Sequence, residues 1–529
     1  MKWRINLVFF LIFLFSAALL GKLFFIQVLQ GDFYKALAQG LHILPEEIRT
    51  ERGEIYFKNG ETLAINWNWP LIFASPPKVK EPEKTADILS SILSFDKNFI
   101  LEKLQGESLY ALIKNRLSQE EVELLKTNNL DGIFIGEERG RYYPQEGLVS
   151  QVVGFLGAEG SGQYGLEEYY DTALQGSSKG TDLTLTIDYD IQFLAEKLLE
   201  GAKENLDIEE GQIIVIDPYS GKILAMANFP NFNPNQYKEY ATAGDLKIFQ
   251  NGATQKIFEP GSVFKPITMA AALNEEKVTP ETTYTDPGII EIGGWPIYNY
   301  EQRIYPGVLT MTNVLEKSIN TGAVFAGRQL GGELFKKYIE KFGIFEPTGI
   351  DLEETCPENK EFKQGREINF ATAFFGQGIE MTPIQLIRAY SAIANGGKLV
   401  TPYLVEQNKE PESFESIISS KTSSQLAAML ISVVENGFAK SARIPGYYVA
   451  GKTGTAQVSY SALGINKQGY SEKTIQVFVG FAPALNPQFL ILVKLNNPKT
   501  KTAEYSAVPI FHDLAEHIIH QYQIPPDYD

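Results

Sequence analysis

A serine and a lysine three residues apart, at the start of an apolar helical stretch, constrain this chain more than any other feature of its sequence. Ser262 and Lys265 lie in the run FEPGSVFKP (residues 258–266), and residues 267–273 continue it with helical character. Residues i and i+3 share one face of a helix, so the hydroxyl and the amine come within hydrogen-bond reach in the first turn. The spacing therefore predicts a fold that presents this pair at a helix start.

The chemistry of such a pair depends on the protonation state of the lysine. Serine is a poor nucleophile unless a neighbouring base removes its proton, and Lys265 can be that base only if its pKa falls. A helix N-terminus, desolvation and a second cation all lower the pKa, and Lys452 is the candidate cation. The alternative is an ordinary helix start with Ser262 as N-cap. A second serine–lysine pair, Ser94 and Lys97, lacks this helix-entry context.

A second set of polar residues is the triplet Ser318-Ile319-Asn320, which precedes small residues that allow close helix packing. On the catalytic interpretation Ser318 relays a proton between Lys265, Lys452 and a leaving amine, and Asn320 holds the substrate backbone. The alternative is a helix-start serine followed by a buried asparagine.

The third set is Lys452-Thr453-Gly454-Thr455. An edge strand with Gly454 lets a substrate backbone approach closely, while Lys452, Thr453 and Thr455 offer a cation and two hydroxyls to a terminal carboxylate. We expect the backbone N–H groups of Ser262 and Thr455 to form an oxyanion hole. The alternative is a glycine-rich strand edge without a catalytic role. Taken together and in this order, the three sets favour an acyl-transfer site.

Other catalytic chemistries have little support in the sequence. The four histidines, at 42, 512, 517 and 520, are far from Ser262 along the chain, so a Ser-His-Asp triad is not indicated. His517 and His520 are three residues apart on an expected helix and are interpreted as surface residues, so no metal site is predicted. Gly376-Gln377-Gly378 lacks the context of a nucleotide-binding loop. We expect no cofactor.

Composition limits the partners and the domain count. The 529 residues are enough for two or three domains, and the net charge of −17 argues against a nucleic-acid partner, which requires a basic surface. The single cysteine, Cys356, excludes an internal disulfide.

The N-terminal segment predicts a membrane anchor. Residues 5–26 are almost wholly apolar and match the roughly 20 residues of a membrane-spanning helix. A cleavable signal peptide is the alternative, but Ser16-Ala17-Ala18 is a poor cleavage site and the apolar run continues past it. Lys2 and Arg4 indicate a cytoplasmic N-terminus with the rest of the protein outside.

Hydrophobic patterns beyond the anchor predict a mixed fold. Residues 55–64 resemble a hairpin with Asn59-Gly60 at its tip, and helical pieces are expected at 87–93 and 118–125. From residue 182 onward, strands are expected at 183–187, 213–216, 223–226, 476–481 and 489–495, and helices at 190–199, 263–273, 312–330, 383–394, 422–435 and 509–522. Strands at both ends of a helical middle predict an α/β fold in which helices sandwich a largely antiparallel sheet.

These motifs resemble those of class B penicillin-binding proteins, the membrane-anchored peptidoglycan D,D-transpeptidases, over nearly the whole chain. Residues around Tyr284–Tyr300 and Lys452 are more similar to division-type than to elongation-type members. Phe57-Lys58 departs from a common Asp-Arg, which is expected to weaken an internal salt bridge. Besides the three catalytic sets, the similar segments are 51–55, 141–144, 165–167, 185–188, 217–218, 375–378, 382–383 and 479–483.

The resemblance implies the penicillin-recognising serine transferase fold and a role for each motif residue. Ser262 would be the acylated nucleophile and Lys265 its general base. Ser318, Asn320 and Lys452 would complete proton transfer and substrate positioning. The other strand residues, Thr453, Gly454 and Thr455, would bind the substrate. The donor would be a stem peptide ending in D-Ala-D-Ala, the acceptor an amine of a neighbouring stem peptide, and β-lactams would acylate the same serine.

It also implies an organisation, a location and partners. We expect a cytoplasmic tail and transmembrane anchor at 1–28, an elongated α+β membrane-proximal pedestal or dimerisation-type module at 29–181, a transpeptidase domain at 182–524 and a tail at 525–529. The protein would be single-pass in the plasma (inner) membrane, with its catalytic domain on the outer face and a SEDS-type glycan polymerase as partner. A D,D-carboxypeptidase, a β-lactamase and a non-catalytic scaffold or β-lactam sensor remain as alternatives.

Overall fold

The structure is a computed structural model that describes residues 2–29, 31, 34–35, 51–177, 179–406, 414–467 and 469–528. Its internal contacts divide the chain into two compact units. The first contains residues 1–52, 65–142 and 177–179, and the second contains residues 53–64, 143–176 and 180–529. Residues 143–176 thus pack with the second unit. The domain limits expected after residues 28, 181 and 524 stay predictions.

The N-terminal segment is helical, as predicted. Helix α1 (Lys2–Phe24) continues into a short π-helix, η1 (Phe25–Leu29), and the segment Asn6–Gln27 is long and apolar enough to cross a membrane. None of that segment is buried within the protein. An apolar helix with no protein around it fits a single-pass membrane anchor.

The first unit contains a small sheet with helices packed on it. Residues 65–74 of β2 (Thr62–Ala74) pair antiparallel with β4 (Ile133–Tyr142) and β3 (Ala111–Lys114). Besides α1, the first unit has the helices α3 (Pro82–Leu93), α4 (Lys97–Leu104) and α5 (Gln119–Asn128), which confirms the helical segments predicted at 87–93 and 118–125.

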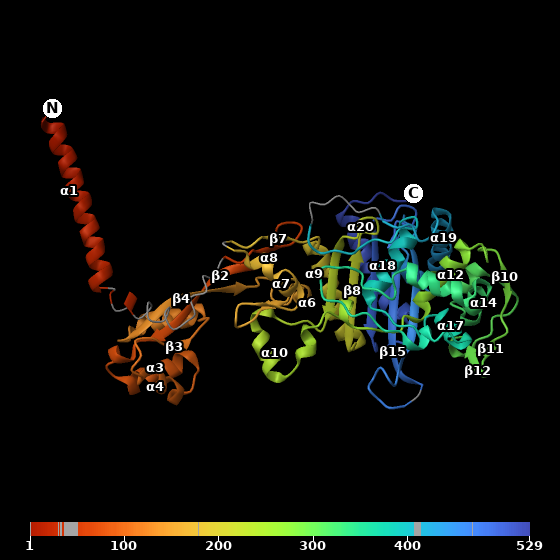
Figure 1. The fold of residues 1–529 in the computed structure, drawn as a ribbon, viewed down its shortest axis with the longest axis horizontal. Coiled ribbons are helices and arrows are strands. Elements are labelled where there is room, and N and C mark those ends of the chain that lie inside the picture. Colours follow the sequence, from red (N-terminus) through yellow and green to blue (C-terminus); the bar gives the residue numbers. More distant parts are fainter. Residues whose placement is uncertain are drawn as a thin grey trace. The chain divides into compact units, whose positions relative to one another are not determined.

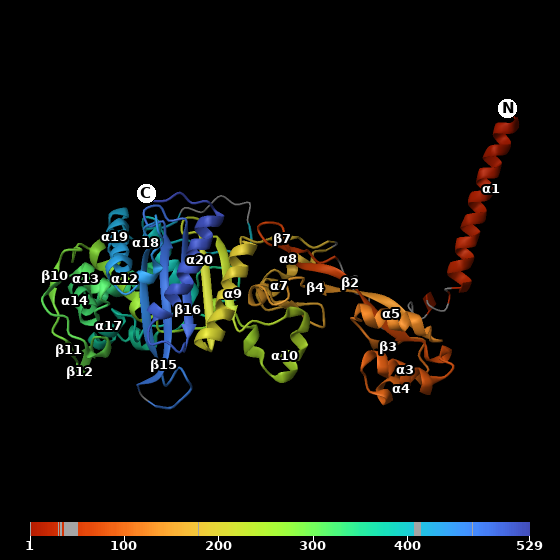
Figure 2. The same ribbon diagram turned by 180° about the vertical axis from the view of Figure 1, so that it is seen from behind.

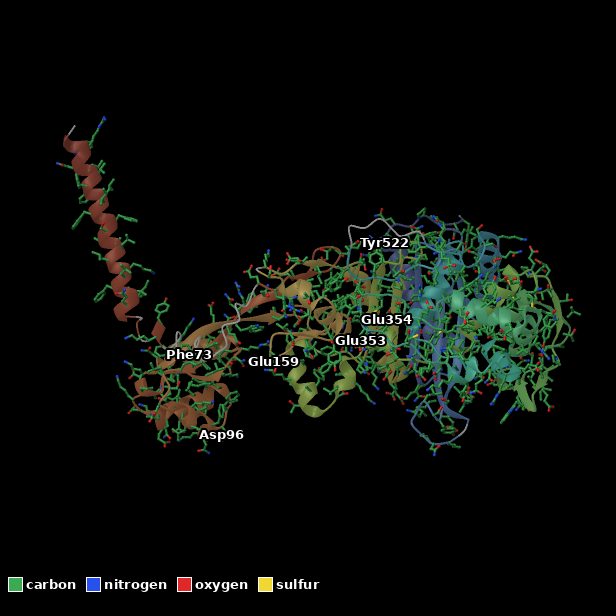
Figure 3. All side chains as sticks on the ribbon, viewed as in Figure 1. Phe73, Asp96, Glu159, Glu353, Glu354 and Tyr522 are labelled. Carbon is green, nitrogen blue, oxygen red and sulfur yellow. The ribbon has the colours of Figure 1, made fainter. Side chains whose placement is uncertain are left out.

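The serine–lysine pair of this unit has no catalytic geometry. Ser94 ends α3 in the left-handed region, with a φ of 55°, and Lys97 lies 2.7 Å from Asp87. Asp96, labelled in Figure 3, instead accepts hydrogen bonds from the backbone N–H groups of Asn98 and Phe99 and so caps α4. This pair is part of a helix junction.

A five-stranded antiparallel sheet forms the centre of the second unit. Its strand order is β14 (Ala450–Ser459), β15 (Tyr470–Ala482), β16 (Phe489–Asn496), β8 (Glu210–Ile216) and β9 (Ile223–Phe229). Every neighbouring pair is antiparallel, as predicted. Strand β14 therefore lies at one edge, where no other strand of the described residues pairs with it, and it carries Lys452 to Thr455.

Helices cover both faces of this sheet. Helices α9 (Tyr189–Leu206) and α20 (Ala507–Gln521) contact each other and the strands on one face, in front of the sheet in Figure 2. Helix α18 (Pro383–Ala394) packs on the opposite face and lies in front of the sheet in Figure 1, and helix α19 (Ser420–Asn436) packs against α18 and the edge strand β14. The predicted sandwich of helices around an antiparallel sheet is confirmed.

Shorter elements complete the second unit. The predicted hairpin is present as β1 (Ile55–Tyr56) paired with residues 62–64 of β2, and β7 (Leu183–Thr184) adds to β1 in parallel. The other helices are α6 (Ser150–Val153), α7 (Gly165–Tyr169), α8 (Asp171–Gln175), α10 (Tyr237–Ala243), α11 (Gly252–Gln255), α12 (Lys265–Asn274), α13 (Met311–Glu316), α14 (Asn320–Leu330), α15 (Gly332–Lys341), α16 (Lys360–Lys363) and α17 (Glu367–Ala373). The other strands are β5 (Phe155–Leu156), β6 (Gly162–Gln163), β10 (Thr283–Thr285), β11 (Ile289–Ile292), β12 (Trp295–Tyr298) and β13 (Val308–Thr310).

One predicted helix is wrong in a way that matters for the site. The single helix expected at 312–330 is two helices, α13 and α14, separated by residues 317–319. Ser318 adopts a φ of 53°, in the left-handed region that a helix cannot contain. The chain therefore turns at the predicted Ser318-Ile319-Asn320 set.

Candidate active site

The serine–lysine pair lies where a short 3-10 helix leads into a longer helix. Residues Gly261–Phe264 form the 3-10 turn η5, and α12 begins at Lys265. Gly261 has a φ of 59° and donates its backbone N–H to the Gly376 carbonyl at 2.9 Å, which fixes the sharp approach to Ser262. The Nζ of Lys265 is 2.8 Å from the Oγ of Ser262. The predicted contact between hydroxyl and amine is present.

Lys265 is surrounded by acceptors. The side chain is 1% exposed, and its Nζ lies 2.8 Å from the Ser318 carbonyl oxygen, 2.8 Å from Asn320 Oδ1 and 3.1 Å from Ser318 Oγ. Burial, helped by the charge of Lys452, lowers the pKa of Lys265 well below its ordinary value. The second predicted set therefore meets the first.

The left-handed turn explains how Ser318 reaches Lys265 with two atoms. Because the chain reverses between α13 and α14, the carbonyl and the hydroxyl of Ser318 both face the Lys265 amine. Asn320 begins α14, and its Nδ2 donates to the carbonyl of Tyr298 at 2.9 Å. An uninterrupted helix would have engaged that Ser318 carbonyl in its own hydrogen bonding.

Lys452 brings the third set to the same place. It lies on the edge strand β14, is 0% exposed, and its Nζ is 3.1 Å from Ser318 Oγ and 2.9 Å from the Thr453 carbonyl. Burial lowers the pKa of Lys452 to about 7. Two buried amines thus share one hydroxyl, so a proton can move between them without passing through bulk water.

The rest of the edge strand runs close to the serine turn. A Cβ on Gly454 would lie 3.0 Å from Val263 Cγ1 and 3.2 Å from the Pro260 carbonyl oxygen, so only glycine fits without displacement of its neighbours. Thr453 is largely buried, and Thr455 Oγ1 accepts the backbone N–H of Ala503 at 3.2 Å. The oxyanion hole expected from the Ser262 and Thr455 N–H groups stays a prediction.

Several contacts around the site were not predicted from the sequence. Glu259 Oε1 accepts the Gly378 N–H and its Oε2 accepts the Tyr470 hydroxyl, each at 3.1 Å. The Tyr390 hydroxyl donates to the Val263 carbonyl at 2.5 Å. Glu259 is three residues before Ser262 in the sequence, so its place near the site could have been predicted. Tyr390 lies on helix α18, 127 residues from Val263 along the chain, and no sequence signal marked its contact.

Among the residues that the structure describes, no histidine belongs to this site. His512, His517 and His520 are all on α20, as predicted, and His42 lies outside the described residues. His512 and His517 are only partly exposed, each with a buried ring nitrogen that has no hydrogen-bond partner, so the expected surface position holds only for His520. Among the described residues no cluster of three or more His, Cys, Asp or Glu side chains is placed to hold a metal ion.

The arrangement has the parts of a serine acyltransferase. It combines a hydroxyl, a buried amine of lowered pKa in contact with it, a second buried amine, and an edge strand beside them. Comparison with known proteins points the same way. The sequence model of the penicillin binding protein transpeptidase domain matches residues 211–516, and that of the penicillin-binding protein dimerisation domain matches residues 47–188.

Relatives and solved structures match over most of the chain. Stage V sporulation protein D of Bacillus subtilis is 32% identical, over 90% of this chain and 79% of the relative. A peptidoglycan D,D-transpeptidase FtsI homolog of Mesostigma viride is 29% identical, over 99% of this chain and 96% of the relative. The crystal structure of penicillin binding protein 3 from Mycobacterium tuberculosis, complexed with aztreonam, is 26% identical, with a TM-score of 0.71 over 90% of this chain and 97% of that chain. The protein belongs to the class B penicillin-binding proteins.

Proposed function

We propose that this protein is a peptidoglycan D,D-transpeptidase that cross-links stem peptides through an acyl-enzyme on Ser262. The donor is a stem peptide ending in D-Ala-D-Ala, and β-lactams acylate the same serine. The observation that carries the proposal is the position of the Lys265 amine, which is buried and 2.8 Å from Ser262 Oγ. A neutral amine at that distance can take the serine proton as the hydroxyl attacks.

The neighbours of Lys265 determine where its lone pair points. A neutral amine has two N–H bonds and one lone pair. Two carbonyl oxygens, those of Ser318 and the Asn320 side chain, lie 2.8 Å from Nζ and can only accept hydrogen bonds. When both N–H bonds are used in this way, the lone pair remains for the O–H of Ser262. This geometry supports our proposal that Lys265 is the general base.

The remaining residues take roles that follow from their positions. Ser318 Oγ bridges the two amines and returns the proton to the leaving D-alanine nitrogen. Lys452 supplies a positive charge, and Thr453 and Thr455 supply hydroxyls, for the terminal carboxylate of the donor. Gly454 keeps the edge strand close enough for a substrate backbone to pair with it. The backbone N–H groups of Ser262 and Thr455 stabilise the oxyanion.

Reaction of the full chain with a fluorescent penicillin tests this proposal directly. Intact-protein mass spectrometry is expected to show one added label, and peptide mapping is expected to place it on Ser262. A Ser262→Ala variant serves as the control and takes up no label. Label on another residue, or no label on the wild type, contradicts the proposal.

Reaction with a stem peptide separates the transpeptidase from the neighbouring possibilities. In the presence of an amine acceptor we expect a cross-linked product, whereas release of free acid alone indicates a D,D-carboxypeptidase. Rapid deacylation of the penicillin adduct indicates a β-lactamase. Wall growth supported by Ser262→Ala in cells indicates a scaffold or sensor. The intact hydrogen-bonded set of Ser262, Lys265, Ser318 and Lys452 favours the enzyme over the scaffold.

The anchor and the family suggest where the protein works. We propose a single-pass protein of the plasma membrane with a cytoplasmic N-terminus, supported by Lys2 and Arg4 before the apolar segment. A role in division and a SEDS-type glycan polymerase partner are proposed from the resemblance, and the domain limits at residues 28, 181 and 524 are proposed with them. Cysteine labelling of residue 2 in intact and permeabilised cells tests the orientation.

A further inference from the structure

A buried polar cluster lies directly behind Asn320 and has no part in the mechanism described above. It consists of Asp286, Asn299 and Thr321, which are 6%, 3% and 0% exposed. Thr321 follows Asn320 in the chain, and Asn299 follows Tyr298, whose carbonyl accepts the Asn320 amide. The cluster therefore contains the chain neighbours of both Asn320 and Tyr298, the two residues that this hydrogen bond joins.

The Asp286 carboxylate holds the cluster together through both oxygens. Oδ1 accepts the Thr321 hydroxyl at 2.7 Å and the Gly288 N–H at 2.9 Å, and Oδ2 accepts Asn299 Nδ2 and the Tyr305 N–H, each at 2.9 Å. Burial raises the pKa of Asp286, but the hydrogen bonds from Tyr305, Gly288, Thr321 and Asn299 together outweigh burial, and the pKa lies below its ordinary value. The Asp286 carboxylate is therefore ionised, and each of its oxygens accepts two hydrogen bonds from these groups.

Asn299 transmits this arrangement to helix α14. Its Oδ1 accepts the backbone N–H of Thr321 at 3.1 Å and so satisfies one of the unpaired donors at the start of the helix. The same Oδ1 lies 3.0 Å from the Thr321 hydroxyl oxygen, whose proton it shares with the closer Asp286 carboxylate. Its Nδ2 is held by Asp286 and by the Arg303 carbonyl. Because Tyr298 is the preceding residue, this fixes the Tyr298 carbonyl relative to Asn320.

The Asn320 amide has to point one way for the site to work. Its two ends are nearly the same size, so neighbours alone decide which faces Lys265. The Tyr298 carbonyl can only accept, and it therefore holds Nδ2 and leaves Oδ1 toward Lys265. In the reversed orientation the NH2 group would face the Lys265 amine, and the lone pair of Lys265 would no longer be directed to Ser262.

We propose that Asp286 is a positioning residue for acylation, acting through Asn299, Thr321 and the Tyr298 carbonyl to set the orientation of the Asn320 amide. The inference rests on the proposed function of Ser262 and Lys265. It predicts that the reactivity of Ser262 depends on a carboxylate that does not touch Ser262, Lys265 or a substrate.

The test compares Asp286→Asn with Asp351→Asn in the full chain. Asp351 is a matched control, since it is 5% exposed and also accepts two backbone N–H groups and a side chain, those of Leu404, Val405 and Tyr170. Second-order acylation by a fluorescent penicillin is measured from pH 5 to 10. We expect Asp286→Asn to lower the high-pH plateau about 10-fold or more, and Asp351→Asn to leave it unchanged.

The pH profile separates positioning from loss of stability. Asn320 Oδ1 favours the ammonium form of Lys265, so its loss lowers the pKa of Lys265 and moves the acid limb of the profile to lower pH. A Thr321→Val variant breaks the same cluster without removing the carboxylate and is expected to give the same lower plateau and the same shift. It replaces Asp286→Asn in the test if Asp286→Asn does not fold. In an Asn320→Ala background, Asp286→Asn is expected to cause no further loss.

Three outcomes overturn the inference. The first is acylation at the wild-type rate in both Asp286→Asn and Thr321→Val. The second is a further, additive loss when Asp286→Asn is introduced into the Asn320→Ala background. The third is a loss of acylation that leaves the acid limb in place and that Asp351→Asn shows to the same extent. A wild-type protein that takes up no penicillin on Ser262 is a different result, because it removes the proposed function itself.

Discussion

The hydroxyl oxygen of Ser318 lies 3.1 Å from the Nζ of Lys452. The same oxygen is 3.1 Å from the Nζ of Lys265, so one hydroxyl bridges two buried amines. Burial lowers the pKa of the Lys452 amine to about 7, so this amine can hold or release a proton near neutral pH. The bridge gives a proton from Ser262 a route to the leaving nitrogen.

Replacement of Ser318 separates the role of the hydroxyl from the role of the turn. Ser318→Ala and Ser318→Gly both remove the hydroxyl, and both are expected to lower acylation about 10²-fold. Residue 318 has a φ of 53°, which glycine adopts without cost, so Ser318→Gly is expected to be more stable than Ser318→Ala by about 1 kcal/mol. Stopped-flow acylation and thermal unfolding measure the two effects. An alanine variant that acylates at the wild-type rate contradicts the relay.

Removal of the second amine is expected to shift the pH dependence. Lys265 must be neutral to act as base, so acylation rises with pH through the pKa of Lys265. The positive charge of Lys452 adds to burial in lowering that pKa. In Lys452→Met this contribution is lost, the pKa of Lys265 rises, and the acid limb moves to higher pH.

The measurement is the acylation rate constant from pH 5 to 10, with Lys494→Met as control. Lys494 is also buried and lies two strands away from Gly454 in the sheet, where Gly454 pairs with Val477 and Val477 with Lys494. Its replacement is expected to leave the limb in place. A limb that stays fixed or moves to lower pH in Lys452→Met is evidence against coupling between the two amines.

Local signals made parts of the fold predictable. Helix α18 begins at Pro383 and ends at Ala394, as the sequence indicates, because Thr382 and Gln385 form a capping box before an apolar run. The three motif sets were predictable as one site only through their order and their resemblance to a family. Spacing alone identified the Ser262–Lys265 contact, which is local, but not the contact of Lys265 with Ser318, which joins residues 53 apart.

Long-range contacts decided the features that the sequence did not reveal. The apolar pattern continues through residues 312–330, so nothing local marks the break at Ser318. The break is held by the Lys265 amine, which engages the Ser318 carbonyl. Asp286 and Asn299 are likewise 35 and 22 residues from Thr321 along the chain, so their meeting depends on the folded state alone.

A side chain at position 454 is expected to impair the site by separating two elements. The added Cβ would meet Val263 Cγ1 at 3.0 Å and the Val263 backbone nitrogen at 3.2 Å, next to Ser262. Gly454→Val is therefore expected to lower acylation about 10²-fold, and Gly454→Ala by less. Gly201→Ala is the control, since its nearest neighbour is 4.0 Å away on helix α9. It is expected to acylate normally and to gain about 0.5–1 kcal/mol of stability. Equal acylation by Gly454→Val and the wild type contradicts this close approach.

The buried lysine of the central sheet makes the stability of the protein depend on pH. Burial, with a smaller effect of Lys256, lowers the pKa of Lys494 to about 8, against an ordinary value of 10.5 that the unfolded chain regains. Between pH 8 and 10.5 the unfolded state therefore binds more protons, and stability rises with pH by an amount on the order of 3 kcal/mol over that window. Lys494→Met lacks this dependence, although it also loses hydrogen bonds to Gln212 and Asn496.

The difference in Tm between the wild type and Lys494→Met isolates this effect, because all other titrating groups are common to both proteins. Calorimetry from pH 7.5 to 10 is expected to show the difference moving in favour of the wild type as the pH rises. The matched comparison is Lys203→Met, whose exposed lysine pairs with Asp207 at the surface, and its Tm difference from the wild type is expected to vary much less with pH. A constant difference for Lys494→Met would show that the folded protein keeps Lys494 as easily protonated as the unfolded chain does. A difference that moved against the wild type as the pH rose would show an ammonium stabilised inside the sheet, in which case the attraction of Glu210 outweighs burial.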